Sequence, residues 1–386
     1  MSRTVRLLVV VLAAAALAAT ACEPAPPADS SNHRPGDPRG WFEAGHLWWG
    51  DFGDPQIVVS GGTYYAYSSP TAGRYLPVLT STNLRDWRIH PRYSSSPTPA
   101  VDANVPVEIR NWSATTVDKW NNNDGLVKPA SWGLQEPQNS WIRKSYWAPG
   151  VAQIGGTWYA YSAVRVSRTG DDPNHFGRFC LTVASASSPL GPFRDTTTSP
   201  ILCDSDPSGS IDPEPFRDPA TGQWYLLWKA AGRVGAYPSS LKAKRLLSNG
   251  RPDPAAPTVT LLRTAGGWEG NTIEAPSMVY HRGRYYLFYA GNSSLPGPSN
   301  SSRYATGYAI CPRGPLAACT RPTNQPLLSS EDTVQGPAGG SAFVDRQGRL
   351  RFVYSYYWLG ETRKPAPRRM EIVTLEPTAS GRLVVK

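Results

Sequence analysis

Short runs of apolar and aromatic residues, each next to a glycine-containing turn, recur along most of the chain. The clearest run is residues 224–228 (WYLLW), which is typical of a β-strand buried on both faces. Similar stretches surround a set of five glycines, namely Gly62, Gly156, Gly222, Gly283 and Gly348. Their spacings are 94, 66, 61 and 65 residues, which leaves room for a few strands in each unit. A strand-built repeat of this period predicts an all-β, five-bladed β-propeller.

The first interval is longer than the others because an insertion precedes the second repeat. Residues 98–140 lack clear periodicity and are rich in Asn, Pro and Trp. A structureless insertion of this length in a compact fold is more often functional than accidental. We expect residues 98–145 to lie on the face that carries the active site and to shape it.

The N-terminal residues have the features of an export signal. Two arginines precede an apolar run at residues 7–19, which is too short to span a bilayer stably. Small residues then lead to Cys22, as in a bacterial lipoprotein box, although Ala19 stands where Leu is usual. We predict that residues 1–22 are a signal peptide ending at a lipidated Cys22, with ordinary cleavage and release as the alternative.

The remainder of the chain divides by composition into a linker and a catalytic domain. Residues 23–45 are rich in Pro and Ser and are expected to form a tether. Residues 46–386 are expected to form the propeller. The protein would then be secreted, or anchored by lipid to the outer face of the bacterial cell membrane. The lipid is the only membrane contact that we expect, and we expect a monomer.

Composition and charge agree with an exported β-protein. The chain has 14 Trp and 19 Tyr but only 3 Met, and outside the signal no long segment has helical periodicity. The net charge of +10 comes from scattered basic residues without a nucleic-acid-binding motif. Nucleic acid is therefore not an expected partner. A solvated basic surface is favoured over one that binds an acidic polysaccharide.

Four cysteines lie beyond the signal. Cys180 and Cys203 flank one strand-turn-strand segment, and Cys311 and Cys319 flank a short loop. Two local disulfides are the simplest pairing in an oxidising compartment, with free thiols as the alternative. The cysteine spacings match no zinc pattern.

Acidic residues stand near a proline at the start of three repeats: Asp54, Asp212 and Glu274. The corresponding places in the other two repeats are Gly150 and the region of residues 338–339, without an acid. Because the innermost strand of every blade begins near the propeller axis, residues at a repeated position converge on one pocket. Glycosidic cleavage needs such a set, with one carboxyl protonated to donate to the leaving oxygen and another ionised to activate water or attack the sugar.

These motifs resemble those of glycoside hydrolase family 43, the five-bladed propeller group of arabinanases, arabinofuranosidases and xylosidases. The matching stretches, in the family's order, are residues 53–55 (GDP), 147–149 (WAP), 210–213 (SIDP) and 273–276 (IEAP). The resemblance implies that Asp54 is the general base, that Asp212 orients and tunes the acid, that Glu274 is the general acid, and that configuration is inverted. We also predict Trp147 as an apolar platform for a sugar ring, with an ordinary core role as the alternative.

Two places depart from the family's pattern. Many members have Asp after Trp-Ala-Pro, where this chain has Gly150, so a polar neighbour of the site is missing. Many members also carry His in a Gly-Pro-Gly-His stretch that is often associated with bound calcium. Residues 336–341 (GPAGGS) contain no His, so neither a metal nor another cofactor is predicted.

The sequence thus predicts an inverting glycoside hydrolase whose partner is an arabinose- or xylose-containing polysaccharide or oligosaccharide. An arabinofuranosidase or arabinanase is favoured over a xylosidase. The alternatives are a non-catalytic carbohydrate-binding propeller and a retaining β-fructosidase-like enzyme, whose Arg-Asp-Pro motif is similar to residues 217–219. The sugar, the linkage and endo or exo cleavage depend on how residues 98–145 fill the cleft. Exo action on arabinofuranosides is favoured, because the insertion could close one end of a groove.

Overall fold

The structure is a computed structural model that describes residues 51–70, 75–90, 125–134, 146–167, 177–205, 208–232, 238–359 and 366–386. The chain separates into residues 1–34 and residues 35–386, and every described residue belongs to the second unit. The predicted signal peptide and linker therefore lie outside the described residues. Within the described ranges, no helix is long and apolar enough to cross a membrane.

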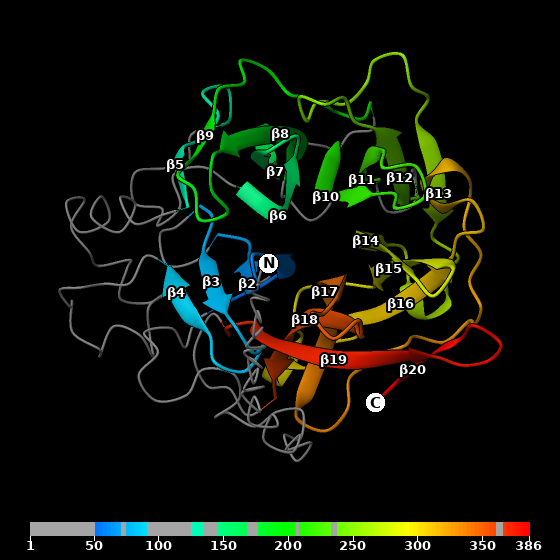
Figure 1. Ribbon diagram of the computed structural model, residues 1–386. Helices are drawn as coiled ribbons and strands as arrows, with labels where there is room; N and C mark the ends of the chain where they lie inside the picture. The colour runs from blue at the N-terminus through cyan, green and yellow to red at the C-terminus, as the bar shows by residue number, and fades with distance from the viewer. Residues whose placement is uncertain are drawn as a thin grey trace, which may run out of the picture. The chain divides into compact units, whose positions relative to one another are not determined.

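The described chain forms five sheets, each built from consecutive parts of the sequence (Figure 1). The first blade contains β1 (Gln56–Ser60), β2 (Thr63–Tyr67), β3 (Val78–Ser81) and β4 (Arg88–His90). The second contains β6 (Tyr146–Ile154), β7 (Thr157–Ser167), β8 (Arg178–Ala186), β9 (Phe193–Asp195) and β5 (Leu126–Lys128).

The remaining three blades follow one another along the chain. The third contains β10 (Ser210–Arg217), β11 (Trp224–Ala230), β12 (Ser240–Arg245) and β13 (Val259–Arg263). The fourth contains β14 (Ile273–His281), β15 (Arg284–Gly291) and β16 (Ala305–Ile310). The fifth contains β17 (Val334–Val344), β18 (Leu350–Trp358), β19 (Arg369–Pro377) and β20 (Leu383–Val385). Three short 3-10 helices lie in loops: η3 (Gly267–Glu269), η4 (Pro298–Asn300) and η5 (Gly314–Leu316).

The innermost strands close a ring. Contacts join β1 to β6, β6 to β10, β10 to β14, β14 to β17, and β17 back to β1. Figure 1 shows these strands around the centre, with β13, β19 and β20 toward the outside. The predicted all-β, five-bladed propeller is therefore confirmed.

The five glycines of the sequence repeat each lie in the hairpin between the first and second strand of a blade. Their φ angles are all positive: 80° at Gly62, 87° at Gly156, 73° at Gly222, 80° at Gly283 and 75° at Gly348. Residues with a Cβ atom rarely adopt this left-handed conformation, whereas glycine adopts it without steric cost. The spacing of these glycines is thus the spacing of the hairpins.

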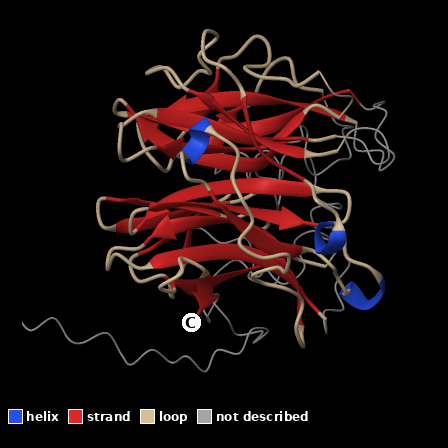
Figure 2. Cartoon of the chain, turned by 90° about the vertical axis from the view of Figure 1, so that its right-hand side faces the viewer, coloured by secondary structure: helices blue, strands red, loops and turns tan. Residues whose placement is uncertain are grey.

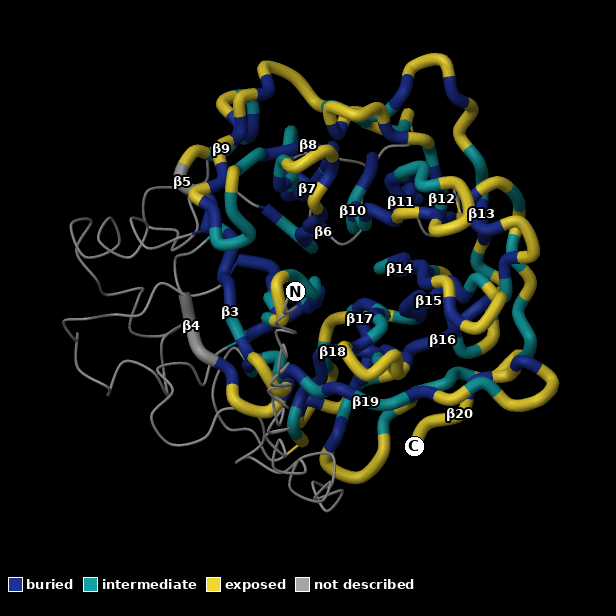
Figure 3. The backbone as a smooth tube through the Cα atoms, in the orientation of Figure 1, coloured by how far each residue is buried: buried dark blue, intermediate teal, exposed yellow. Residues whose placement is uncertain are grey.

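The core lies between neighbouring blades. Leu227 of the third blade and Leu287 of the fourth are fully buried in one apolar cluster, and similar clusters lie between other neighbouring blades. Figure 2 shows the strands as tightly stacked layers, and Figure 3 shows exposed backbone mainly at the rims. Replacing such a buried Leu by Ala typically costs about 2–5 kcal/mol of stability.

The second blade differs from the prediction. Residues 126–128, which the sequence placed in a structureless insertion, form β5 and pair in parallel with β9. The third strand of this blade, β8, is therefore not its outer edge, because β9 and β5 follow it in the sheet. An edge strand of three residues is too short to produce a periodic signal. Apart from residues 125–134, the insertion at 98–145 lies outside the described residues.

Both predicted disulfides are present. Cys180 of β8 pairs with Cys203, and the bond fastens the loop after β9 to the edge of β8, where Leu181 donates to the carbonyl of Leu202. Cys311 pairs with Cys319 across η5, and Cys319 donates to the carbonyl of Leu261. Each bond therefore holds a peripheral loop against its own or a neighbouring sheet.

Candidate active site

A left-handed kink recurs at the start of every innermost strand. The residues at the kink are Asp54, Ala148, Asp212, Ala275 and Gly339, with φ of 53°, 45°, 54°, 50° and 64°. In the first four blades a proline follows, although a residue before proline normally favours extended backbone. Non-glycine residues in this conformation are strained, and such strain gathers at functional sites. The kink interrupts the pairing with the second strand and turns these residues toward the axis.

This register corrects the sequence alignment of the three acids. Asp54 and Asp212 do occupy the same position, but their counterpart in the fourth blade is Ala275, and Glu274 lies one residue earlier. In the second blade the counterpart is Ala148 rather than Gly150, because residues 148 and 149 form the unpaired kink. The error arose because the acid-proline spacing in the fourth blade is one residue longer.

Backbone packing explains the absence of a side chain at Gly150. A Cβ atom there would lie 2.2 Å from the carbonyl oxygen of Pro213 and 2.5 Å from Cδ of Pro215. The side chain of Gln56 occupies nearby space instead, where it accepts from the amide of Val151 at 2.6 Å and donates to its carbonyl at 3.2 Å. The missing acid is thus replaced by close contact between the second and third blades.

Asp54 accepts hydrogen bonds from two side chains. Oδ2 accepts from Oγ of Ser69 at 2.6 Å and from Nη1 of Arg368 at 2.9 Å. Arg368 also forms a two-point ion pair with Asp51, in which Nε and Nη2 each lie 3.0 Å from a carboxylate oxygen. Gly53 makes room for this guanidinium, since a Cβ atom there would lie 1.7 Å from its central carbon. A carboxylate with these donors is suited to accept a proton from water.

The ionisation of Asp212 is changed by its surroundings. Burial first, and then the negative charge of Glu274, raise the pKa of Asp212 to about 7, against the effect of Lys229. Its Oδ2 accepts from the amide of Ala275 at 2.9 Å, which links the third and fourth blades at their kinks. Asp212 therefore carries a proton for part of the time near neutral pH.

Glu274 has a partner on each carboxylate oxygen. Lys229 of β11 places Nζ 2.7 Å from Oε2, and the hydroxyl of Tyr304 donates to Oε1 at 2.7 Å. Burial and the charges of Glu274, Asp54 and Asp212 raise the pKa of Tyr304 well above its ordinary value, so this hydroxyl keeps its proton. A Cβ atom on Gly339 would lie 3.0 Å from Oδ1 of Asp54 and 3.3 Å from the hydroxyl of Tyr304, so Asp54 lies near the hydrogen bond between Tyr304 and Glu274. Asp212 lies beside the same group, since it accepts from the amide of the residue after Glu274.

A small cavity lies among the kinks of the five innermost strands. It has a volume of about 30 Å³ and is lined by Asp54, Asp212, Gln56, Glu214 and Ser341 among others. This is the space of one water molecule. Glu214, which follows the kink in the third blade, is partly buried, and desolvation raises its pKa to about 8 against hydrogen bonds from Gln56 and Ser277.

Trp147 is placed beside the site but packs on the protein. Its ring stacks on Phe179 at a centroid distance of 4.2 Å and an angle of 27°, and the guanidinium of Arg165 lies 6.0 Å from its centroid. Trp147 is partly buried against the cluster between the second and third blades. Its role as a sugar platform stays a prediction.

Several residues around the acids were missed by sequence reasoning. Lys229 gave a usable signal, because a charged residue at the end of a strand that is otherwise apolar demands a buried partner. Arg368 lies in a basic, proline-containing stretch that resembles exposed surface, and Tyr304 and Ser69 lie in loops. Nothing local in the sequence distinguishes these three.

The residues of the fifth blade do not fit the calcium site that the family resemblance suggests. Gly339 and Gly340 offer no side-chain ligand, and Oγ of Ser341 already accepts from the amide of Ile57 at 3.3 Å. In the part of the chain that the structure describes, no group of three or more His, Cys, Asp or Glu side chains could hold a metal ion.

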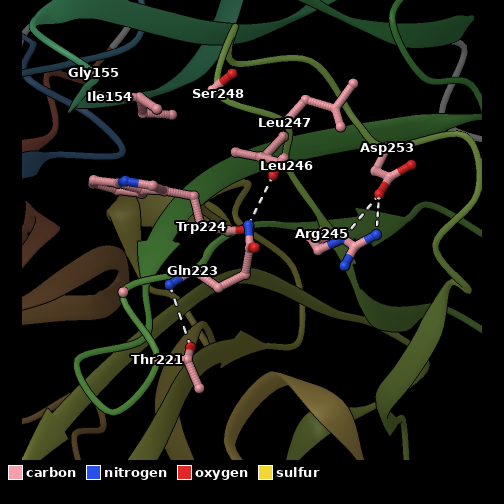
Figure 4. A pocket seen from close by; sticks show the side chains of 11 residues that line it. Ile154, Gly155, Thr221, Gln223, Trp224, Arg245, Leu246, Leu247, Ser248 and Asp253 are labelled. Atoms are coloured by element: carbon pink, nitrogen blue, oxygen red, sulfur yellow. Dashed lines mark hydrogen bonds and ion pairs between the residues drawn. The ribbon is translucent and has the colours of Figure 1, made fainter.

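A wider hollow of about 450 Å³ lies at the opposite end of β6 and β10 from the acids (Figure 4). Trp224 and the Arg245–Asp253 ion pair line it. Trp224 follows the hairpin glycine by two residues, as do Tyr64, Trp158 and Tyr285, so the repeat explains this aromatic residue. The hollow is remote from Asp54, Asp212 and Glu274.

The chain is similar to known proteins in sequence and in fold. The model of "Glycosyl hydrolases family 43" matches residues 93–382, which include Asp212 and Glu274. Extracellular endo-alpha-(1->5)-L-arabinanase 1 of Bacillus subtilis is 22% identical over 308 residues, covering 78% of this chain and 79% of the relative.

Two solved structures extend the comparison. A thermostable family-43 glycoside hydrolase has a TM-score of 0.62 at 23% identity, covering 87% of this chain and 93% of that one. An alpha-L-arabinanase of Cellvibrio cellulosa has a TM-score of 0.56 at 17% identity, covering 87% and 95%. The family match excludes the β-fructosidase-like alternative and disfavours a propeller that only binds carbohydrate. The chain belongs to family 43 of the glycosyl hydrolases and is an O-glycosyl hydrolase.

Proposed function

We propose that this protein hydrolyses α-L-arabinofuranosyl linkages in arabinose-containing polysaccharides or oligosaccharides, with inversion at the anomeric carbon. The observation that carries the proposal is that Asp54, Asp212 and Glu274, from three blades, lie near one another: Glu274 accepts from the hydroxyl of Tyr304, Asp54 lies with that hydroxyl beside Gly339, and Asp212 accepts from the amide that follows Glu274. Two carboxyl groups with different partners suit the two tasks of an inverting glycosidase. Arabinose is favoured over xylose because the curated relative is an arabinanase.

In this proposal Asp54 is the general base and Glu274 the general acid. Asp54, which forms an ion pair with Arg368, would take a proton from the attacking water. Glu274 donates its proton to the leaving oxygen. Asp212 would act on Glu274 through the repulsion between their negative charges. The charge on Asp212 is only partly present near neutral pH, because its pKa is raised to about 7. Trp147 would contribute an apolar wall near the kink of the second blade.

We further propose that the protein acts outside the cell. The two disulfides are typical of an oxidising compartment, and the curated relative is extracellular. The lipid anchor at Cys22 rests on the sequence of residues 1–22 alone. Mass spectrometry of the membrane fraction would test the anchor, because an unmodified, freely released chain would contradict it.

The enzymatic proposal is tested by measuring release from para-nitrophenyl arabinofuranoside, para-nitrophenyl xyloside and linear arabinan. Activity on the arabinofuranoside or on arabinan is expected, with xyloside cleaved more slowly. NMR of the first product should show the inverted anomer. Oligosaccharide or monosaccharide products from arabinan distinguish endo from exo action. Xyloside as the preferred substrate would overturn the choice of sugar.

A further inference from the structure

Lys229 is a buried cation in a strand that is otherwise apolar. It lies on β11 opposite Ile211, next to the kink of the third blade, and its side chain is 8% exposed. Removing an ammonium group from water costs several kcal/mol unless it is paired and hydrogen-bonded. The ion pair with Glu274 supplies such a partner across the gap between two blades.

The charged groups around the pocket form two cation-acid pairs. Arg368 of the fifth blade pairs with Asp54 of the first, and Lys229 of the third pairs with Glu274 of the fourth. Asp212 lies beside the second pair, since its Oδ2 accepts from the amide of Ala275, the residue after Glu274, at 2.9 Å. Each of the two proposed reacting carboxyl groups thus has a cation within hydrogen-bond distance.

The reaction moves negative charge from one pair to the other. The proton of Glu274 passes to the glycosidic oxygen, and the bond from that oxygen to C1 breaks with its electron pair staying on oxygen. Water forms the new C1–O bond and gives a proton to Asp54. Before the step the charge lies on Asp54 beside Arg368, and after the step it lies on Glu274 beside Lys229.

We propose that Lys229 is a positioning residue that stabilises the carboxylate left on Glu274 when the acid donates its proton, while Tyr304 fixes the orientation of that carboxyl group. This inference rests on the proposed function, in which Glu274 is the general acid. Lys229 bonds to one oxygen and the Tyr304 hydroxyl to the other, so the plane of the carboxyl group is set from both sides. Neither residue was part of the motif pattern in the sequence.

A charge-stabilising role has a kinetic signature that a structural role lacks. A poor leaving group needs a proton in the transition state, so loss of Lys229 should slow it. A leaving group that departs as a stable anion needs no proton and should be little affected. In the variant, Glu274 should also keep its proton to higher pH than in the wild type, because the neighbouring positive charge is gone.

The test compares Lys229→Met, Lys229→Arg and Tyr304→Phe on an arabino-oligosaccharide and on a dinitrophenyl arabinofuranoside. For Lys229→Met we expect kcat to fall about 10–100-fold on the oligosaccharide and less than about threefold on the aryl substrate, within the range of general acid catalysis. The alkaline limb of kcat/KM should move to higher pH. Lys229→Arg should recover part of the loss, and Tyr304→Phe should lower kcat on the oligosaccharide without moving that limb.

Equal losses on both substrates with an unshifted pH profile would overturn the inference, since only a structural role would then remain. Lys229→Gln, neutral but polar, repeats the comparison if the Met variant does not fold, as judged by its melting curve. Wild-type inactivity on both substrates would overturn the proposed function, and the inference with it. The two failures are therefore distinguishable.

Discussion

Arg368 joins Asp54 across 314 residues of sequence, with Nη1 2.9 Å from Oδ2. The contact closes the ring, because Arg368 immediately precedes β19 of the last blade and Asp54 precedes β1 of the first. The carbonyl of Arg368 also accepts from the amide of Phe52 at 2.8 Å. Arg368 thus helps to close the ring of blades and also contacts Asp54, the proposed general base.

Arg368→Met should impair both stability and activity. The substitution leaves Asp51 and Asp54 without their shared cation. Because their side chains are 19% and 25% exposed, the cost should be smaller than the about 3–5 kcal/mol of a fully buried pair. We expect a lower free energy of unfolding in urea and a fall in kcat of at least about tenfold, because general base catalysis is worth about 10²–10⁴. Arg346→Met is the matched control, since Arg346 crosses the same seam to the carbonyl of Gly62, remote from the acids. Similar losses in both variants would contradict a special role for Arg368.

Glu274→Gln and Asp54→Asn should differ in their dependence on the leaving group. Glu274→Gln removes the donated proton, so hydrolysis of arabino-oligosaccharides should fall severely while an activated aryl glycoside is spared. Asp54→Asn should slow both substrates about equally, because water must be activated in either case. Loss should be about 10²–10⁴-fold where the missing group is needed. Steady-state kinetics on the two substrates check this, and equal losses for Glu274→Gln would show that the acid is wrongly assigned.

Glu214→Gln should change how stability depends on pH. The pKa of Glu214 is raised to about 8, so the folded state binds its proton more tightly than the unfolded state. This contribution to stability is complete at low pH and is lost as pH rises toward 8. The variant has no such loss, so its free energy of unfolding relative to wild type should increase by up to about 1.4 kcal/mol per pH unit between about pH 5 and 8. Urea denaturation across this range is the measurement, and parallel curves would contradict the prediction.

Removing either disulfide should destabilise the protein, with the longer loop costing more. The bonds close separations of 23 and 8 residues. In the chain-entropy model these correspond to about 3.4 and about 2.5 kcal/mol. Paired Cys→Ala variants, unfolded under oxidising conditions, provide the comparison with wild type. A larger loss for Cys311 and Cys319 than for Cys180 and Cys203 would show that contacts of the loops outweigh chain entropy.

The repeat was visible in the sequence because it depends on local rules. Gly222 and Gly348 mark hairpins that require positive φ, and the aromatic runs beside them have the length of buried strands. The acids Asp54 and Asp212 were found because each precedes a proline at the same place in its repeat. Local patterns therefore sufficed to predict the architecture and to select the acids proposed for the site.

The remaining features depend on contacts between distant segments. The pairing of Arg368 with Asp54 and of Lys229 with Glu274 joins different blades, and no local pattern specifies either partner. The register of Glu274 depends on which residues form the kink, which became clear only from strand pairing. The three-residue strand β5 is fixed by its neighbour β9 rather than by its own sequence.

The way in which the ring is closed has a consequence for heat inactivation. Among the described residues, no β-ladder joins the first sheet to the fifth, so the two are held by side chains such as Arg368 and by isolated amide contacts. Such a junction can open locally while each sheet stays intact. Asp54 would then lose its contact with Arg368 before the propeller unfolds. The enzyme should lose activity reversibly at temperatures below those at which its far-ultraviolet circular dichroism changes.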